Sequence, residues 1–168
     1  MRKPVLGYEF YFLQDFPNSY FFETDLGIKY EVKFKPFEYF FTTQDFAKNT
    51  FEFVIDLNYN PTNRRPPLDR RVSKSISDIF EDFYLKFSET ITIYVCDSSD
   101  SRQLSRSRKF HIWFEEFHGE RYFKYDTSLS DSTGEVFPIS LIFRKNNRDR
   151  LKIIIEFDAI MEGYNSGK

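Results

Sequence analysis

The sequence predicts a single α+β domain over residues 1–168, with a largely antiparallel, aromatic-rich sheet of six to seven strands and two helices packed on one face. Aromatic residues make up 20% of the chain, and such rings favour strands and pack on sheet faces. Apolar and polar residues alternate in both terminal thirds, whereas two central segments have the helical period. The expected order of elements is βββ-α-β-α-βββ.

Strands are expected in the N-terminal third. Alternation over residues 28–35 predicts a strand with one buried and one solvent-facing side, and residues 24–27 predict the turn that joins it to a strand over 20–23. The same alternation over 51–59 predicts a further strand, and the aromatic residues of 8–12 are a candidate for another.

A helix, a strand and a second helix are expected in the centre. Prolines break the periodicity over residues 60–67, which are expected to form a linker. Apolar residues then return on one helical stripe, formed by Val72, Ile76, Ile79, Phe80, Phe83 and Phe87. The apolar run 91–95 predicts a buried strand, and a second helix is expected to begin near Ser101, with Phe110, Trp113, Phe114 and Phe117 on one face.

The C-terminal third is expected to return to strands. Residues 122–127, 137–143 and 151–157 are rich in β-branched and aromatic side chains. The charged segment 144–150 is expected to be the hairpin connection between the last two strands.

Composition limits the compartment and the partners. The formal net charge of −2 does not indicate a wholly basic surface for nucleic acid. The single cysteine, Cys96, rules out an intrachain disulfide and a CxxC-type zinc or redox site, and it favours a reducing compartment. The sequence shows no apolar leader segment and no run long enough to span a bilayer. A soluble cytoplasmic protein without a cofactor or a metal site is expected.

The candidate ligand site is the polar segment between the strand 91–95 and the second helix. Its residues are Cys96, Asp97, Ser99, Asp100, Arg102, Gln103 and Arg106. In one interpretation, Arg106 pairs with Asp97 or Asp100, and Gln103 completes a helix cap with Asp100. In the other, the same groups line a pocket in which the first amides of the helix receive an anion. The sequence leaves both interpretations open.

Two short motifs in this segment resemble known sites. Cys96 and Arg102 have the Cys-x5-Arg spacing of cysteine-dependent phosphatases, in which a thiolate attacks phosphorus and arginine holds the oxygens. Asp97 and Asp100 would repel a phosphate dianion, however, and the segment has no glycine. Asp97, Ser99 and Ser101 are similar to the cation-binding motif of von Willebrand A-type domains, but there the motif follows an early strand of a different sheet. Neither motif identifies a catalytic residue or a metal ligand.

A longer pattern resembles an uncharacterised family of small bacterial proteins, known mainly from Bacteroidetes, with strands rich in Phe and Tyr near the N-terminus. The pattern consists of Thr24, Gly27 and Tyr30, the segment 96–100, Arg102 and Gln103, and Trp113 and Phe114. The resemblance implies no activity and no catalytic residues.

We therefore expect a non-enzymatic binding or protein-interaction module whose partner is an unidentified protein or small ligand. The alternative is an enzyme, or a protein that binds a small anion or phosphoester through residues 96–106. Single-stranded nucleic acid is third, because arginine clusters such as 64–65 and 70–71 could hold phosphates beside tyrosines, although acidic residues interleave them. Aromatic sheet edges are prone to pair, which leaves a homodimer open.

Overall fold

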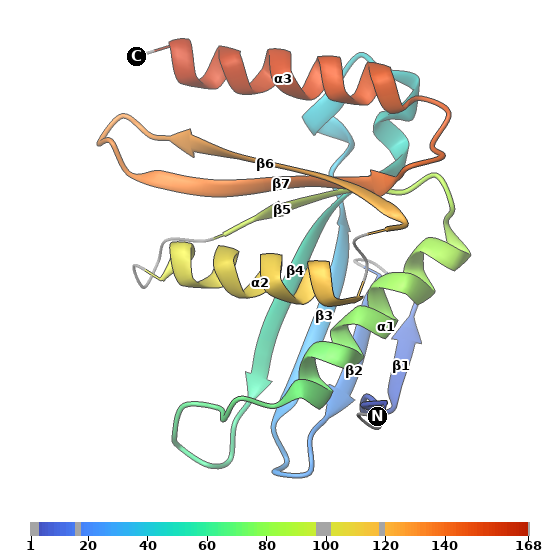
Figure 1. Cartoon of the computed structure of the whole chain (residues 1–168), viewed down its shortest axis with the longest axis vertical. Coiled ribbons are helices and arrows are strands. Elements are labelled where there is room, and N and C mark those ends of the chain that lie inside the picture. Colours follow the sequence, from blue (N-terminus) through green and yellow to red (C-terminus); the bar gives the residue numbers. More distant parts are fainter. Residues whose placement is uncertain (1–3, 16–17, 97–101, 118–119, 168) are drawn as a thin grey trace. The chain divides into compact units, whose positions relative to one another are not determined.

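The computed structural model of the chain describes residues 4–15, 18–96, 102–117 and 120–167. Its strands are β1 (Phe10–Leu13), β2 (Ser19–Glu23), β3 (Lys29–Pro36), β4 (Thr50–Tyr59), β5 (Ile91–Val95), β6 (Tyr122–Ser130) and β7 (Val136–Arg144). Its helices are α1 (Arg70–Lys86), α2 (Gln103–Phe117) and α3 (Arg150–Ser166), with short 3-10 helices η1 (Glu38–Phe41) and η2 (Asp45–Asn49). The strands form one mixed sheet in the order β1-β2-β3-β4-β5-β7-β6 (Figure 1). The predicted α+β class is confirmed.

Contacts between residues divide the chain into two compact units. The first comprises Met1–Lys35 and Phe53–Ser88, and the second comprises Pro36–Glu52 and Glu89–Lys168. The expected single domain over residues 1–168 stays a prediction.

The predicted hairpin lies in the first unit. Strands β2 and β3 pair antiparallel, with Tyr20 opposite Val32. In the turn between them, the Thr24 hydroxyl accepts a hydrogen bond from the Ile28 amide at 3.2 Å. Gly27 has a φ of +73°, a backbone conformation that costs a glycine little and other residues more. The turn chemistry visible in the sequence therefore sets the register of these strands.

Helix α1 buries the predicted stripe against the strands of the first unit. Phe34 of β3 and Phe83 of α1 stack with their ring centroids 3.8 Å apart and an interplanar angle of 5°. Phe53 and Phe80 pack at right angles to each other beside this pair, with their centroids 5.5 Å apart. All four rings are buried. Ring-to-ring contacts of this kind add to the free energy gained by burying apolar area.

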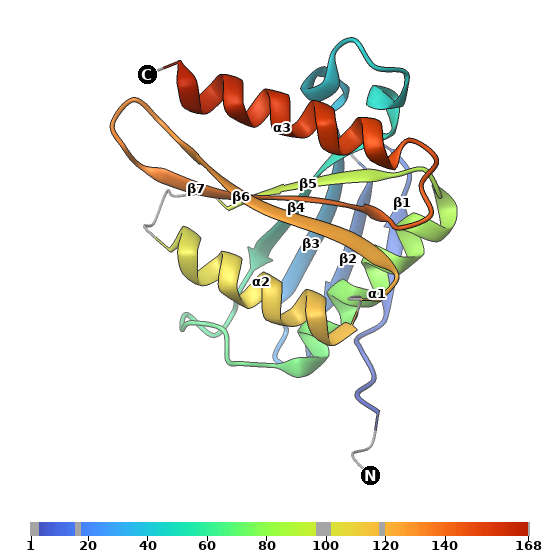
Figure 2. The same ribbon diagram turned by 45° about the horizontal axis from the view of Figure 1, so that its top comes forward.

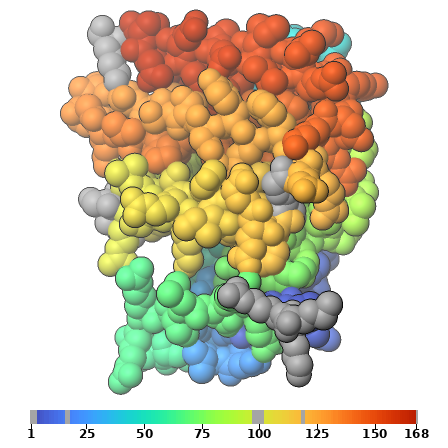
Figure 3. Space-filling view, viewed as in Figure 1, coloured from blue at the N-terminus to red at the C-terminus, as the bar shows by residue number. Residues whose placement is uncertain are grey.

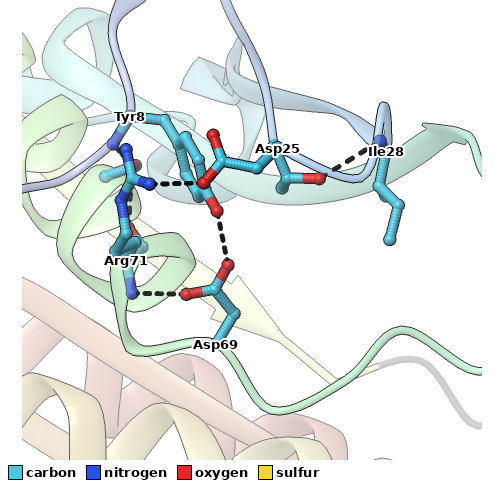
Figure 4. Close-up of polar contacts among 7 residues, drawn as sticks. Tyr8, Asp25, Ile28, Asp69 and Arg71 are labelled. Atoms are coloured by element: carbon cyan, nitrogen blue, oxygen red, sulfur yellow. Dashed lines mark hydrogen bonds and ion pairs between the residues drawn. The ribbon is translucent and has the colours of Figure 1, made fainter.

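A polar network joins the N-terminal segment to the start of α1 (Figure 4). The Tyr8 hydroxyl donates to Asp69 at 2.7 Å, and the second oxygen of this carboxylate accepts from the Arg71 amide at 2.8 Å, which caps the helix. The Arg71 guanidinium lies 3.9 Å from the centroid of the Tyr8 ring and donates to Asp25 at 2.7 Å. Three segments distant in sequence are thus held at one helix end.

Gly7→Ala is expected to destabilise the protein by about 1–2 kcal/mol, because the backbone of Gly7 lies against α1. A Cβ at this position would lie 2.9 Å from the Ser75 Oγ and 3.0 Å from the Ser75 amide nitrogen. The Ser75 Oγ also accepts from the Tyr8 amide at 2.6 Å, so it has little freedom to move away. Urea unfolding at low micromolar protein concentration measures the effect. Gly163→Ala is the comparison: a Cβ there meets no atom within 4 Å, so the same added methyl group should stabilise α3 slightly rather than destabilise the fold. An unchanged unfolding midpoint for Gly7→Ala would contradict this packing.

The second unit contains a parallel pair of strands that was not expected from the sequence. Thr50–Glu52 of β4 pairs parallel with Ile91–Ile93 of β5, whereas β5 with β7 and β7 with β6 are antiparallel. A parallel pair requires a long crossover, and the chain between β4 and β5 contains α1. The prediction of a largely antiparallel sheet is therefore correct in outline. It is wrong for the pair β4 and β5, which is parallel.

The expected strand over residues 151–157 is wrong, because this segment lies within α3. Its helical stripe consists of Ile153, Phe157 and Met161, all buried against the sheet. The expected hairpin over residues 144–150 is wrong for the same reason. Asn147 is buried there, and its side chain accepts a hydrogen bond from the Asp149 amide at 2.9 Å, which shapes the turn into the helix.

The expectation of two helices on one face is also corrected. There are three helices among the described residues, and in the second unit α2 and α3 lie on opposite faces of β5, β7 and β6 (Figures 1 and 2). The face toward α3 has an aliphatic and aromatic core, in which Leu141 and Phe143 of β7 join Phe157. The face toward α2 contains Tyr94 and Tyr122, which pack on Phe110 and Phe114. Because helices cover both faces, polar residues on β6 and β7 are partly enclosed.

Candidate functional site

The structure describes four of the predicted site residues, which lie around the end of β5 and the start of α2: Cys96, Arg102, Gln103 and Arg106. Cys96 follows β5 directly and is buried, and its amide donates to the Pro138 carbonyl at 3.0 Å. Arg102 is exposed just before α2, Gln103 is the first residue of the helix, and Arg106 is half-buried in its first turn. Asp97, Ser99 and Asp100 lie outside the described residues, so the cap that they would form stays a prediction.

The Cys96 thiol lies among polar groups of β5, α2 and β6. Burial raises the pKa of Cys96; hydrogen bonds from Tyr94 and Ser107 and the charges of Arg106 and Lys124 oppose this rise without cancelling it. Burial raises the pKa of Tyr94 as well. A nucleophilic cysteine needs a lowered pKa, so the shift at Cys96 runs opposite to the one that the phosphatase-like spacing requires.

Gln103 connects the start of α2 to the start of β7. Its side-chain amide donates to the Val136 carbonyl at 3.4 Å, and its Oε1 is buried with no hydrogen-bond partner among the residues that the structure describes. Both predicted arginines, Arg102 and Arg106, have polar or electrostatic contacts. The structure thus brings Cys96 and Arg106 together and gives Gln103 a separate contact to β7.

A neighbouring ion pair was not predicted from the sequence. The Lys124 ammonium lies 2.5 Å from both carboxylate oxygens of Asp126, and only 6% of the Lys124 side chain is exposed. It also lies 5.9 Å from the ring centroid of Phe110 and 5.8 Å from that of Phe114. The Ser140 hydroxyl donates to Asp126 at 2.6 Å. We call this set the α2 polar cluster: Tyr94, Cys96, Arg106, Ser107, Lys124, Asp126 and Ser140.

The α2 polar cluster satisfies its groups largely from within. The Lys124 charge is balanced by Asp126, and the raised pKa keeps the Cys96 thiol protonated at neutral pH. No group of three or more His, Cys, Asp or Glu side chains that could hold a metal ion occurs in the part of the chain that the structure describes. The arrangement is suited to fixing α2 on the sheet.

Cys96 is expected to react slowly with a thiol reagent in the native protein. Cys96 is 2% exposed, and the raised pKa of its thiol lowers the thiolate fraction at neutral pH relative to a free cysteine. Labelling with a chromogenic disulfide reagent at pH 7 should be at least about tenfold slower in buffer than in urea. The same chain in urea is the control, because unfolding exposes the thiol. Native labelling faster than in urea would instead indicate an activated cysteine.

A second candidate surface is the outer side of α3. Leu151 and Ile155 lie one turn apart there and are 67% and 65% exposed, and Ala159 continues the same line. In the space-filling view, the residues of α3 (red) lie beside those of β6 and β7 in the same unit (Figure 3). We call Leu151, Ile155 and Ala159 the outer stripe of α3. The opposite side of the helix is buried, so α3 has apolar residues on two sides.

These features define an α+β protein with a mixed sheet, a polar cluster between a helix and that sheet, and a helix with an uncovered apolar stripe. Within this class, the model of DUF6169, described as a family of unknown function, matches residues 68–164, and the chain belongs to this family. The predicted resemblance to an uncharacterised family is confirmed. No curated protein and no solved structure matches the chain.

The matched region contains both candidate surfaces. It runs from the residue before the cap of α1 to near the end of α3, and so includes residues 96–106 and the outer stripe of α3. The element formed by Thr24, Gly27 and Tyr30 lies outside it. Among the described helices, none is long and apolar enough to cross a lipid bilayer.

Proposed function

We propose that the chain is a non-enzymatic protein-interaction module of the cytoplasm that binds its partner through the outer stripe of α3. The observation that carries the proposal is the exposure of Leu151 and Ile155 on a helix whose other side is already packed on the sheet. The buried side of α3 accounts for only one of its two apolar sides, and large apolar residues grouped on a surface mark interaction sites.

The ends of the outer stripe support a protein partner. Exposed basic side chains, Arg148, Arg150 and Lys152, surround its first turn, and the exposed Glu162 lies at its other end. An apolar strip with a charged boundary is the usual composition of a protein interface. The protonated Cys96 and the internally paired Lys124 support a structural role for the α2 polar cluster rather than a ligand site. The lone thiol supports the cytoplasm, where cysteines stay reduced.

Site-specific photo-crosslinking tests the proposal. A photo-reactive amino acid replaces Ile155 in cells that naturally produce the chain, and the matched control places it at Ser105, which is exposed on α2. Position 155 is expected to yield a discrete protein adduct that position 105 does not. Adding Leu151→Glu, one turn away on the same stripe, should remove the adduct. The same smear of adducts from both positions would overturn the proposal.

A further inference from the structure

We propose that the partner of the outer stripe is a second copy of this chain, with two α3 helices packed antiparallel about a two-fold axis at the level of Phe157. The inference rests on the proposed function, since it assigns the occupant of the same surface. An interface of this kind is self-complementary: each residue on one side of the axis faces a different residue of the other copy.

The outer stripe has the geometry needed for helix pairing. With 100° between successive residues, Leu151, Ile155 and Ala159 fall within an arc of roughly 80°. Glu162 falls inside the same arc, and Lys152 and Gly163 lie at its margin. Every one of these residues is exposed. The buried side of the helix, centred on Phe157, points the opposite way and holds α3 on its own sheet.

Side-chain sizes match in an antiparallel pair centred at Phe157. Ile155 of one copy then lies at the level of Ala159 of the other, and Leu151 lies at the level of Gly163. Each large apolar side chain thus meets a small residue, the condition under which two helices approach closely. The large residues lie in the first half of the stripe and the small residues in the second half, so an antiparallel arrangement places large side chains opposite small ones.

Residues of opposite charge also lie opposite one another about the same two-fold axis. Lys152 of one copy lies at the level of Glu162 of the other, and the two-fold axis generates this pair twice. Both side chains are exposed on α3. Two apolar pairs and one charged pair are therefore all symmetric about the level of Phe157. Glu156 and Asp158, nearest the axis, lie at the flanks of the stripe, and Asp158 hydrogen-bonds to Tyr125 of its own chain.

The glycine at position 163 supports the dimer independently of these pairs. It lies in the last turn of α3, where a glycine weakens a helix relative to alanine. A Cβ at this position would meet no atom of the chain within 4 Å, so its own fold does not require a glycine. The close approach of Leu151 from a second copy accounts for it.

Analytical ultracentrifugation of the full chain over a range of concentrations tests the inference. The wild-type chain is expected to show a reversible monomer–dimer equilibrium. Lys152→Glu and Glu162→Lys should each raise the dissociation constant by about tenfold, because each places like charges opposite one another. The double variant should return to within about threefold of wild type, because the pair is restored in the opposite sense. Lys109→Glu, on the exposed side of α2, is the matched control and should have no effect.

Gly163→Ala separates the dimer from simple helix stability. In the monomer it should raise the melting temperature by about 2 °C, because alanine is the better helix former. In the dimer the added methyl group should collide with Leu151 of the other copy and raise the dissociation constant. A stabilised monomer with weakened association supports the inference, and unchanged association overturns it.

The remaining outcomes separate this inference from the proposed function. A chain that stays monomeric at all concentrations overturns the dimer. If the photo-reactive group at position 155 then still gives a discrete adduct with a different protein, the outer stripe is an interaction surface with another occupant, and the proposed function stands. If it gives none, both fail.

Discussion

Phe83→Ala is expected to lower the free energy of unfolding by about 3–5 kcal/mol, the largest effect that we predict for a single substitution. The Phe83 ring is fully buried in the first unit and stacks on Phe34 at 3.8 Å. It also packs on Phe87, with the ring centroids 4.8 Å apart, and on Tyr20 at 6.5 Å. Truncation to alanine removes all of these contacts at once, and the surrounding rings cannot close the cavity because their own positions are set by packing.

Guanidinium titration followed by far-UV circular dichroism measures this effect. Leu85→Ala is the matched control: Leu85 lies two residues away on the same helix and is 68% exposed, so its loss should cost less than about 0.5 kcal/mol. Because both variants place alanine in α1, the difference between their unfolding free energies reports the contribution of the buried Phe83 ring. Equal midpoints for the two variants would show that the stacked rings contribute little to stability.

The same rings explain why the first unit was the more predictable part of the fold. Its helix and hairpin are specified by local patterns: residues such as Ile76, Phe80 and Phe83 recur at helical spacing, and Gly27 ends the turn. Periodicity of this kind is visible in a short window of sequence because one side of each element faces solvent. The linker at residues 60–67 was recognisable for the opposite reason, since its prolines exclude regular structure.

Helix α3 was mistaken for a strand because its sequence satisfies both periods. Leu151, Ile153, Ile155 and Phe157 are apolar at every second position, as in a strand. Ile153, Phe157 and Met161 are apolar at every fourth position, as in the helix that forms. β-branched residues favour strands only weakly, and tertiary packing overrides such a preference. The outer stripe is the reason for the ambiguity: without exposed Leu151 and Ile155, the strand pattern would not exist.

The candidate site was located only in part. The polar residues after β5 stand out because they follow an apolar run, so Cys96 and Arg106 could be identified. Lys124 and Asp126 could not, because alternation with Phe123 and Tyr125 assigns them to the solvent side of a strand. Only the position of α2, which covers that side, encloses the lysine. An inward-pointing charge on a strand at the sheet edge is a known protection against edge pairing, and it is the one signal that a sequence could offer.

Asp126→Asn is expected to destabilise the protein by about 2–3 kcal/mol. The substitution keeps the shape of the side chain and an acceptor for the Ser140 hydroxyl, but it removes the charge that balances the Lys124 ammonium. Breaking a buried ion pair at one partner costs about 3–5 kcal/mol, because a buried charge is left uncompensated. Half of the Asp126 side chain is exposed, at 50%, so water screens part of that cost.

Lys124→Met in the Asp126→Asn background should recover most of the lost stability, because it removes the uncompensated charge and leaves an apolar chain against Phe110 and Phe114. A double-mutant cycle measured by urea unfolding gives the coupling between the two positions. Glu115→Gln, exposed on α2, is the control for loss of a carboxylate alone and should change stability by less than about 0.5 kcal/mol. If the double variant is instead less stable than Asp126→Asn, the lysine contributes through contacts other than this pair. The expected recovery would show that enclosure by α2, rather than the ion pair itself, makes Asp126 necessary.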